Sequence, residues 1–494
     1  MPRRRREQHP MMSEVGVRRR AVMPLVAVAV LAGATAAAIG AISLADALTA
    51  TGLPDPGPLT TYGVPVVRAV GEIAAAAAVG GFLTAAFLVP PQASGVLDAG
   101  GYRAVRLGGI ASAIWAICAA LLVALTVSDV SGLPLHQLGM GDIWAGADLV
   151  EITNAWRWTA VLAALVAVAS IPVLRWSTTP ILLLAALTTL VPLGLSGHSS
   201  TGGAHDMATN SLLIHLGAGA LWVGGLLGLL THALRAGAHL DVAARRFSVL
   251  ALWCYGAIAA SGITNAALRI TPDELLTPYG LLLLAKVSAL GLLGVLGWRQ
   301  RRIGVAALNV DPSERRPLVR LALTEAAIVA VTVGIAVGLG RTPPPPTTAE
   351  PTPAEMAIGF DLSGPPTATR ILLDWRFDLI LGTLAFVLAV LYAVGLFRLR
   401  RSKIGWPTWR TASWMCGCAS LLLVTSSGVG SYMPRCSACT SSCRRRCPPW
   451  CPHSWHRAHL PLSRCAPSLP QPMRQCRDPV SGWSCCFDRR SAGY

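Results

Sequence analysis

The segment SGHSSTGGAHDMATNSLLIHLGAGALWVGGL, residues 196–226, holds a polar loop and the apolar run that follows it. From residue 211 onwards the segment has no charged side chain, and its apolar run continues to about residue 231, long enough for a helix to cross a membrane. The loop before it is rich in glycine, serine and histidine. This pattern predicts a transmembrane helix with a polar entrance.

The rest of the chain has the same apolar texture. Of its 494 residues, 53% are hydrophobic and only 13% are charged, which is typical of a membrane protein. The apolar runs are continuous and do not alternate, so they favour helices over the strands of a β-barrel. The sequence therefore predicts an all-α, polytopic transmembrane helix bundle. About eleven spans are expected, at residues 21–45, 66–90, 104–127, 156–174, 179–195, 211–231, 247–268, 279–297, 319–340, 376–397 and 411–428.

Charge sets the expected orientation. The net charge of +17 is concentrated in every second loop, whereas the intervening loops carry acidic residues. This positive-inside pattern places the basic segment 1–20 in the cytoplasm and residues 196–210 outside, in the plasma (inner) membrane. It also argues against nucleic acid as a partner, and the lipid bilayer is the expected environment. The first span is longer than the apolar part of a signal peptide, so an uncleaved helix is expected.

The chain divides into modules. Residues 21–340 hold nine of the expected spans, with a basic segment, 1–20, before them. Residues 341–370 are proline-rich, which predicts an extended linker on the outer face. Residues 371–434 hold the last two spans, and the texture changes at residue 435.

The tail, residues 435–494, contains nine of the thirteen cysteines. A disulfide-stapled domain fits an odd number poorly, and the cysteines lack the paired spacing of a closed zinc site. In GC-rich DNA, an apolar helix read one nucleotide out of frame becomes rich in Cys, Arg, Trp and His. Restoring one base after Pro434 gives an apolar run that contains methionine and histidine, so an out-of-frame or disordered tail is the favoured interpretation.

Metal-binding side chains gather at the entrance of the sixth span. His198, His205, Met207 and His215 lie within eighteen residues and are soft or borderline ligands, the kind that hold copper, most readily Cu(I), in transient binding. Asp206 can orient a ligand histidine. The alternative is that the loop histidines are solvated and that His215 bonds a neighbouring helix.

Ionisable and amide side chains inside spans are costly and therefore candidates for a pathway. Asn265, Lys286 and Glu325 lie in the seventh, eighth and ninth spans. Lys286 and Glu325 are a candidate pair, although the topology places them nearer opposite faces. Arg68 and Glu72, four residues apart, are expected to pair with each other.

Other features limit the function classes. Four glycines in residues 217–225 predict close helix approach, and His232 and His239 are expected to be solvated on the inner face, where they can receive a metal. We find no P-loop, no phosphorylated-aspartate motif and no nucleophile elbow. The sequence therefore predicts a binding or transport protein, with neither an enzyme's site nor an ATP-driven pump's.

Several motifs carry a resemblance. HLGAGALWVGGL, RRFSVLALWCYGAIAASGITNA, TPYGLLLLAKVSALGLLG and VRLALTEAA, within residues 196–340, resemble the CopD copper-resistance domain. The stretch from LLDWRFDLILG to LLLVTSSGVGSYMP resembles the start of the CtaG cytochrome c oxidase assembly domain. In that family a run containing methionine and histidine follows the YxP turn, and the out-of-frame reading of the tail recovers such a run.

The resemblance implies a function. CopD-like proteins are associated with moving copper across the inner membrane and CtaG-like proteins with delivering it to the oxidase. By this resemblance His198 and His215 handle metal, with a periplasmic copper-binding protein and cytochrome oxidase subunits as expected partners. The expected function is copper binding on the outer face and passage inward. An assembly factor or scaffold that delivers copper without transport is the alternative, and a haem-binding membrane protein is a weaker one.

Overall fold

The computed structural model describes residues 22–40, 55–196, 205–345, 360–362, 364, 367–402 and 405–432. The chain divides into two compact units, Met1–Ser437 and Ala438–Tyr494, and the second lies outside the described residues. So do the predicted basic segment 1–20, most of the linker, and His198. Within the described ranges the chain is helical, and its β-structure is a single bridge between Val96 and Arg175. The all-α prediction is confirmed.

The described part contains ten helices long and apolar enough to cross a membrane, so this is a multi-pass membrane protein. They are Val22–Gly40, Pro58–Leu88, Ala99–Ser131, Glu151–Ala169, Trp176–Leu195, Met207–Leu234, Leu240–Ala267, Pro278–Val310, Arg316–Leu339 and Leu381–Arg401. The eleventh expected span, 411–428, forms helix α16 (Thr408–Ser426) but is not among the ten. Its first half mixes Arg410 with threonine, serine, glycine and cysteine, which lowers its apolar character.

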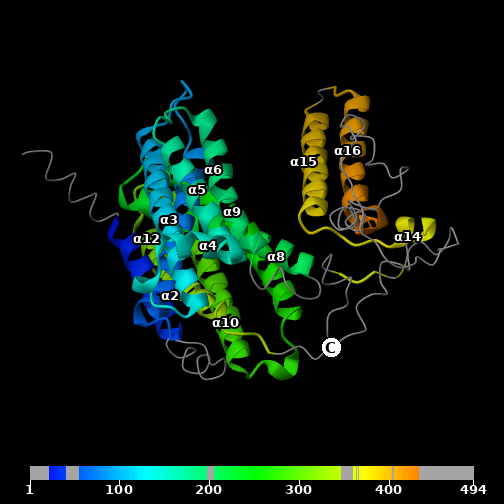
Figure 1. Cartoon of the computed structure of the whole chain (residues 1–494). Helices are drawn as coiled ribbons and strands as arrows, with labels where there is room; N and C mark the ends of the chain where they lie inside the picture. The colour runs from blue at the N-terminus through cyan, green and yellow to red at the C-terminus, as the bar shows by residue number, and fades with distance from the viewer. Residues whose placement is uncertain are drawn as a thin grey trace, which may run out of the picture. The chain divides into compact units, whose positions relative to one another are not determined.

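Helix α2 (Pro58–Leu83) is the centre of the nine-span body (Figure 1). It packs against α3 (Ala99–Ser131), α8 (His205–Leu234), α6 (Thr179–Thr188) and α12 (Arg316–Leu339). The run Ala74–Ala78 and the pair Gly80–Gly81 make this possible, because small side chains let helix backbones approach closely. A Cβ built on Gly80 would meet the backbone of Gly224 on α8. The first helix, Val22–Gly40, packs on α2 through Gly33 and on α12 through Thr35.

The helix of the fifth span is interrupted, and side chains of neighbouring helices form hydrogen bonds with the residue at the interruption. Helix α6 ends at Thr188 and α7 (Val191–Leu195) begins before Pro192, which has no N–H to continue the ladder. The Thr189 carbonyl accepts a hydrogen bond from Thr159 Oγ1 at 3.3 Å, and the Thr189 hydroxyl accepts one from Trp115 Nε1 at 3.3 Å. Freed polar groups are thus satisfied inside the bundle, as lipid requires.

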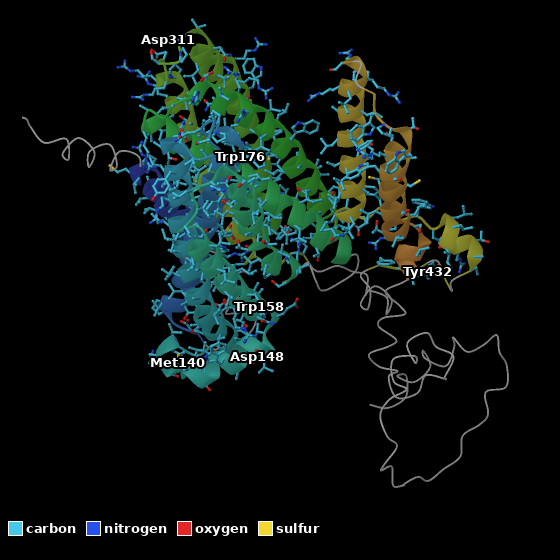
Figure 2. All side chains as sticks on the ribbon, turned by 90° about the horizontal axis from the view of Figure 1, so that it is seen from above. Met140, Asp148, Trp158, Trp176, Asp311 and Tyr432 are labelled. Atoms are coloured by element: carbon cyan, nitrogen blue, oxygen red, sulfur yellow. The ribbon has the colours of Figure 1, made fainter. Side chains whose placement is uncertain are left out.

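Loops on the two predicted sides lie at opposite ends of the body. Figure 2 shows Asp311, which follows the eighth span, at one end, and Met140 and Asp148 at the other. Helix α4 (Met140–Leu149) lies between α3 and α5 (Glu151–Ala169), in a region predicted as an outer loop. The loops therefore alternate between the two ends of the body, as the charge pattern requires. Which end faces the cytoplasm remains a prediction.

The second membrane module is a helical hairpin. Helix α15 (Leu381–Arg401) lies beside α16 (Figure 1). Tyr392 of α15 stacks on Trp414 of α16 with ring centroids 5.4 Å apart. The short helix α14 (Ala368–Leu373) precedes it. The DWRFD motif, residues 374–378, follows α14. Its Asp374 Oδ2 accepts a hydrogen bond at 3.2 Å from Tyr432 of the SYMP motif. Asp378 accepts from the backbone of Ile380 and Leu381 and so caps α15.

Candidate metal site

Helix α8 carries three of the four predicted metal ligands. It begins at His205, six residues before the predicted start of this span, because no glycine or proline interrupts residues 205–216. His205 and Met207 therefore lie in the first turn of a helix, and their prediction as loop residues is corrected. His215 lies nearly three turns inside the helix, where one turn was expected. The side chains of His205 and Asp206 lie outside the described part of the structure.

The helix geometry divides the ligands into two groups. At a rise of about 1.5 Å per residue, His215 lies roughly 15 Å along the axis from His205 and roughly 12 Å from Met207. A single ion bound at its usual ligand distance of about 2 Å cannot draw on both levels without the helix unwinding. His205 and Met207, with His198 as a predicted third member outside the described residues, are named the entrance group, and His215 forms a deeper position by itself.

The deeper position is held by Ser261 on α9 (Leu240–Ala267). The Ser261 hydroxyl donates to the Ala257 carbonyl at 2.7 Å, so its oxygen accepts from His215 Nδ1 at 3.0 Å. The alternative interpretation, in which His215 bonds a neighbouring helix, is thus confirmed. In the tautomer that matches this arrangement, Nδ1 carries the ring proton and Nε2 has the lone pair. Ligand histidines in proteins are oriented in this way, by a hydrogen bond from the ring nitrogen that does not touch the metal.

Asn265 extends this polar seam by one turn towards the entrance. Its Nδ2 donates to Ser211 Oγ on α8 at 2.6 Å and to the Ser261 carbonyl at 3.0 Å. Its Oδ1 is buried without a hydrogen-bond partner in the described part of the chain. Asn265 therefore joins α9 to α8 through a hydrogen bond between the two helices. Ser211 and Ser261 were not predicted, although Ser261 precedes Asn265 by four residues and therefore shares its helix face.

The intramembrane charges are arranged differently from the candidate pairing. Lys286, on α10 (Pro278–Arg299), interacts electrostatically with Glu72 on α2, with Arg269 and with His215. Glu72 also pairs with Arg68 at 3.0 Å, as predicted. Glu72 thus connects α2 with the charge on α10.

Glu325 lies apart from this network. It is 5% exposed on α12, and its Oε1 has no hydrogen-bond partner among the described residues. No ion pair with Lys286 is found within those residues. The candidate Lys286–Glu325 pair is therefore not found among the described residues, and the carboxylate whose field acts on Lys286 is that of Glu72.

The glycines of α8 have two roles. A Cβ on Gly224 or Gly225 would meet α2 or Phe247 of α9, which confirms the predicted close approach. Gly217 and Gly219, two and four residues after His215, have no heavy atom within 4 Å of such a Cβ. Helix α8 is therefore closely packed at Gly224 and Gly225 and has no such close contact at Gly217 and Gly219.

His232, at the other end of α8, is not solvated as predicted. It is 6% exposed, and its Nε2 bonds the Ala238 carbonyl at 2.9 Å in the turn that leads to α9. His239 adopts a left-handed backbone at the start of α9. Among the side chains that the structure describes, no three His, Cys, Asp or Glu residues are grouped to hold a metal ion.

Family comparisons identify the modules. Residues 59–207 match the family described as copper resistance protein D-like, N-terminal domain, and residues 241–339 match copper resistance protein D. Residues 390–439 match the cytochrome c oxidase caa3 assembly factor family. His198, His205 and Met207 fall in the first match, and Asn265, Lys286 and Glu325 fall in the second. His215 lies in the stretch between them.

Curated relatives extend over most of the chain. Uncharacterized proteins of Mycobacterium bovis and Mycobacterium tuberculosis are each 29% identical over 417 residues, which is 81% of this chain and 58% of the relative. One of Mycobacterium leprae is 28% identical over 80% of this chain and 58% of its own length. The chain thus spans little more than half the length of these relatives.

No solved structure matches the chain. The family matches support a copper-related function in the membrane. With the three matches in order along its sequence, the chain joins both parts of a copper resistance protein D region to a cytochrome c oxidase assembly-factor region, the fusion that its motifs predict.

Proposed function

We propose that this protein takes up copper at its outer face and passes it inward through α8. The observation that carries the proposal is the 3.0 Å hydrogen bond between His215 Nδ1 and the Ser261 hydroxyl, which orients the His215 ring between α8 and α9. A neutral imidazole nitrogen is a good ligand for Cu(I). The copper resistance protein D matches on both sides of this helix support copper as the cargo.

Transport proceeds in two steps in this proposal. His198, His205 and Met207 capture Cu(I) at the entrance, and His215 receives it about 12 to 15 Å deeper. Asp206 orients a histidine of the entrance group. Cu(I) suits such a relay because it accepts two or three ligands and exchanges them readily. The ion is bound transiently, and a periplasmic copper-binding protein is the proposed donor.

The charged residues near His215 determine the electrostatic free energy of placing a copper ion there. Lys286 is a cation close to His215, and Glu72 is the carboxylate that offsets it. A second cation at His215 is favoured only while Glu72 remains ionised, since buried charge in a membrane is expensive without an opposite charge. The proposal assigns transport to binding and charge balance and involves no enzymatic step.

The test is copper accumulation in cells that express the full chain. The change His215→Ala is expected to reduce accumulation to the level of cells without the protein, because it removes the only described imidazole at that depth. The matched control is His136→Ala, an exposed histidine in the predicted outer loop between α3 and α4. Cells with the control variant should accumulate copper as the parent does.

Equal accumulation in the parent and in the His215→Ala variant, with both found in the membrane, would remove transport through His215. Equal loss in the His136→Ala variant would point to a general effect of outer-face histidines. Separate changes at His198 and His205 then test the entrance group, and a partial loss is expected from each.

A second function is favoured by the match of residues 390–439 to an oxidase assembly-factor family. An assembly factor or scaffold would deliver copper to cytochrome oxidase subunits without changing total cell copper. Deleting the gene would then lower oxidase activity while accumulation stays constant. Transport predicts the reverse order, with copper content falling first and oxidase activity following it.

A further inference from the structure

A long groove runs between the first helix, α2 and α3. Its volume is about 1040 Å³, and its walls are formed mainly by apolar side chains, among them Val26 and Val30, Ile73 and Ala77, and Ile110 and Ile114. The first helix contacts α2 and α12 through its second half, at Gly33 and Thr35. The groove is therefore bounded where the helices touch and lies along the first half of that helix.

The groove has the length of one membrane leaflet. Along α3 it extends from Tyr102 to Ile114, twelve residues, which corresponds to about 18 Å of helix. Half of a bilayer's hydrocarbon core is about 15 Å thick. Tyr102 lies at the end that the charge pattern assigns to the cytoplasmic boundary, where aromatic side chains are common.

Three arginines line that end of the groove. Arg103 and Arg106 come from α3, and Arg235 follows the last turn of α8. Arg103 and Arg106 are exposed, and neither makes a hydrogen bond or ion pair within the described part of the chain. Arg103 and Arg235 also line a smaller cavity of about 210 Å³ at the start of α3, together with Gly100 and His232.

The acidic residue of that smaller cavity is already engaged. Asp98 Oδ1 accepts the Gly101 N–H at 2.6 Å and caps α3. The cavity and the groove share Arg103, Leu107 and Arg235 in their walls, and this cluster of positive charge favours an anion. The chain's own segment 1–20 is a poor occupant, because it is strongly basic and would meet like charge.

We propose that the groove binds an anionic phospholipid of the inner leaflet. Its acyl chains lie along the apolar walls, and its phosphate lies among Arg103, Arg106 and Arg235. Guanidinium groups bind phosphate through paired hydrogen bonds, and basic pockets between transmembrane helices on the cytoplasmic side suit such headgroups. The proposal is independent of copper, because neither cavity is lined by a residue of the candidate metal site.

The test is native mass spectrometry of the full chain released from detergent after incubation with phosphatidylglycerol and phosphatidylcholine in equal amounts. The parent should retain phosphatidylglycerol. The double change Arg103→Gln with Arg106→Gln should weaken that binding about 30-fold, since each basic side chain near an anionic lipid surface contributes about 1 kcal/mol. If the double variant is not recovered folded, Arg106→Gln alone should weaken it about 5-fold.

The matched control removes two arginines from another position on the same membrane face. Arg316 and Arg320 are exposed at the start of α12 and line neither cavity. Arg316→Gln with Arg320→Gln should leave phosphatidylglycerol binding unchanged. Equal loss in both double variants, or no preference in the parent, would overturn the proposal.

Inorganic phosphate provides a further arm. If millimolar phosphate displaces the lipid from the parent, the arginines bind a free anion and the groove has no role. The change Ala29→Leu, which adds volume to the groove wall and leaves the arginines intact, should also weaken lipid binding. Unchanged binding in that variant would likewise contradict an acyl chain in the groove.

Discussion

The two halves of the nine-span body use apolar sequence in different ways. In the span that contains α2, 72% of the most apolar window is buried within the protein, whereas in the span that contains α10 the share is 11%. The α10 span is the more apolar of the two. In a membrane, lipid solvates apolar side chains, so apolar character does not distinguish a central helix from a peripheral one. Small residues do, as the alanine run of α2 shows.

The same comparison separates scaffold from site. The tightly packed half, around α2, α3 and α5, carries the Arg68–Glu72 ion pair and buried hydroxyl groups, most of which bond inside the bundle. The loosely packed half, around α9 and α10, carries Ser261, Asn265 and Lys286. Helix α8 belongs to both halves, since Gly224 packs on α2 while His215 faces α9. Helix α8 is thus fixed to α2 at its middle and carries His215 where it contacts the more loosely packed half.

The largest expected effect is in the packed half. Trp115 is 1% exposed, packs edge-on against Trp156 with centroids 5.9 Å apart and bonds Thr189. Trp115→Ala should lower the free energy of unfolding by about 3–5 kcal/mol, because it leaves a cavity and an unsatisfied helix break. Trp253→Ala on α9, where the ring is 76% exposed, should change it by less than about 0.5 kcal/mol. Thermal unfolding in detergent measures both, and similar shifts would end the contrast between the halves.

The next effect compares two glycines of one helix. A Cβ on Gly224 would lie 2.7 Å from the Gly80 nitrogen, so Gly224→Ala must push α2 and α8 apart, at a cost of about 1–3 kcal/mol. Gly217→Ala meets no atom within 4 Å and should be neutral or slightly stabilising. The yield of monodisperse protein on size-exclusion chromatography should fall for the first variant only. A loss of monodisperse protein with Gly217→Ala would mean that another group already packs against α8 at this glycine.

The smallest expected effect concerns Ser261, in the loosely packed half. Ser261→Ala removes the acceptor of the His215 Nδ1–H and should weaken copper binding about 10- to 100-fold without changing thermal stability much. Ser261→Thr keeps the hydroxyl and should retain most of the affinity. Cu(I) competition titration of the purified full chain measures both variants. Equal affinities in the parent and in Ser261→Ala would show that Ser261 does not orient a ligand.

Much of the fold could be predicted because membrane spans are local features. Each of the ten helices corresponds to one expected apolar run, and the break in the fifth span lies just before Pro192. Helix ends were less predictable. Helix α8 extends to His205 because polar residues can continue a helix when nothing interrupts the ladder. The predicted loop ligands therefore lie on a helix.

The sequence by itself determined the class of the protein and, for the described residues, the number and order of the membrane-spanning helices to within one, and it predicted which side chains have the chemistry to bind copper. These follow from composition and from side-chain chemistry, which do not depend on the fold. Only the tertiary structure decided which residues meet. His215 bonds Ser261 of α9, the field of Glu72 rather than of Glu325 acts on Lys286, and two arginines of α3 line one groove with Arg235. Such contacts depend on the rotation and depth of each helix, which are set by packing between helices and are not written in any single span.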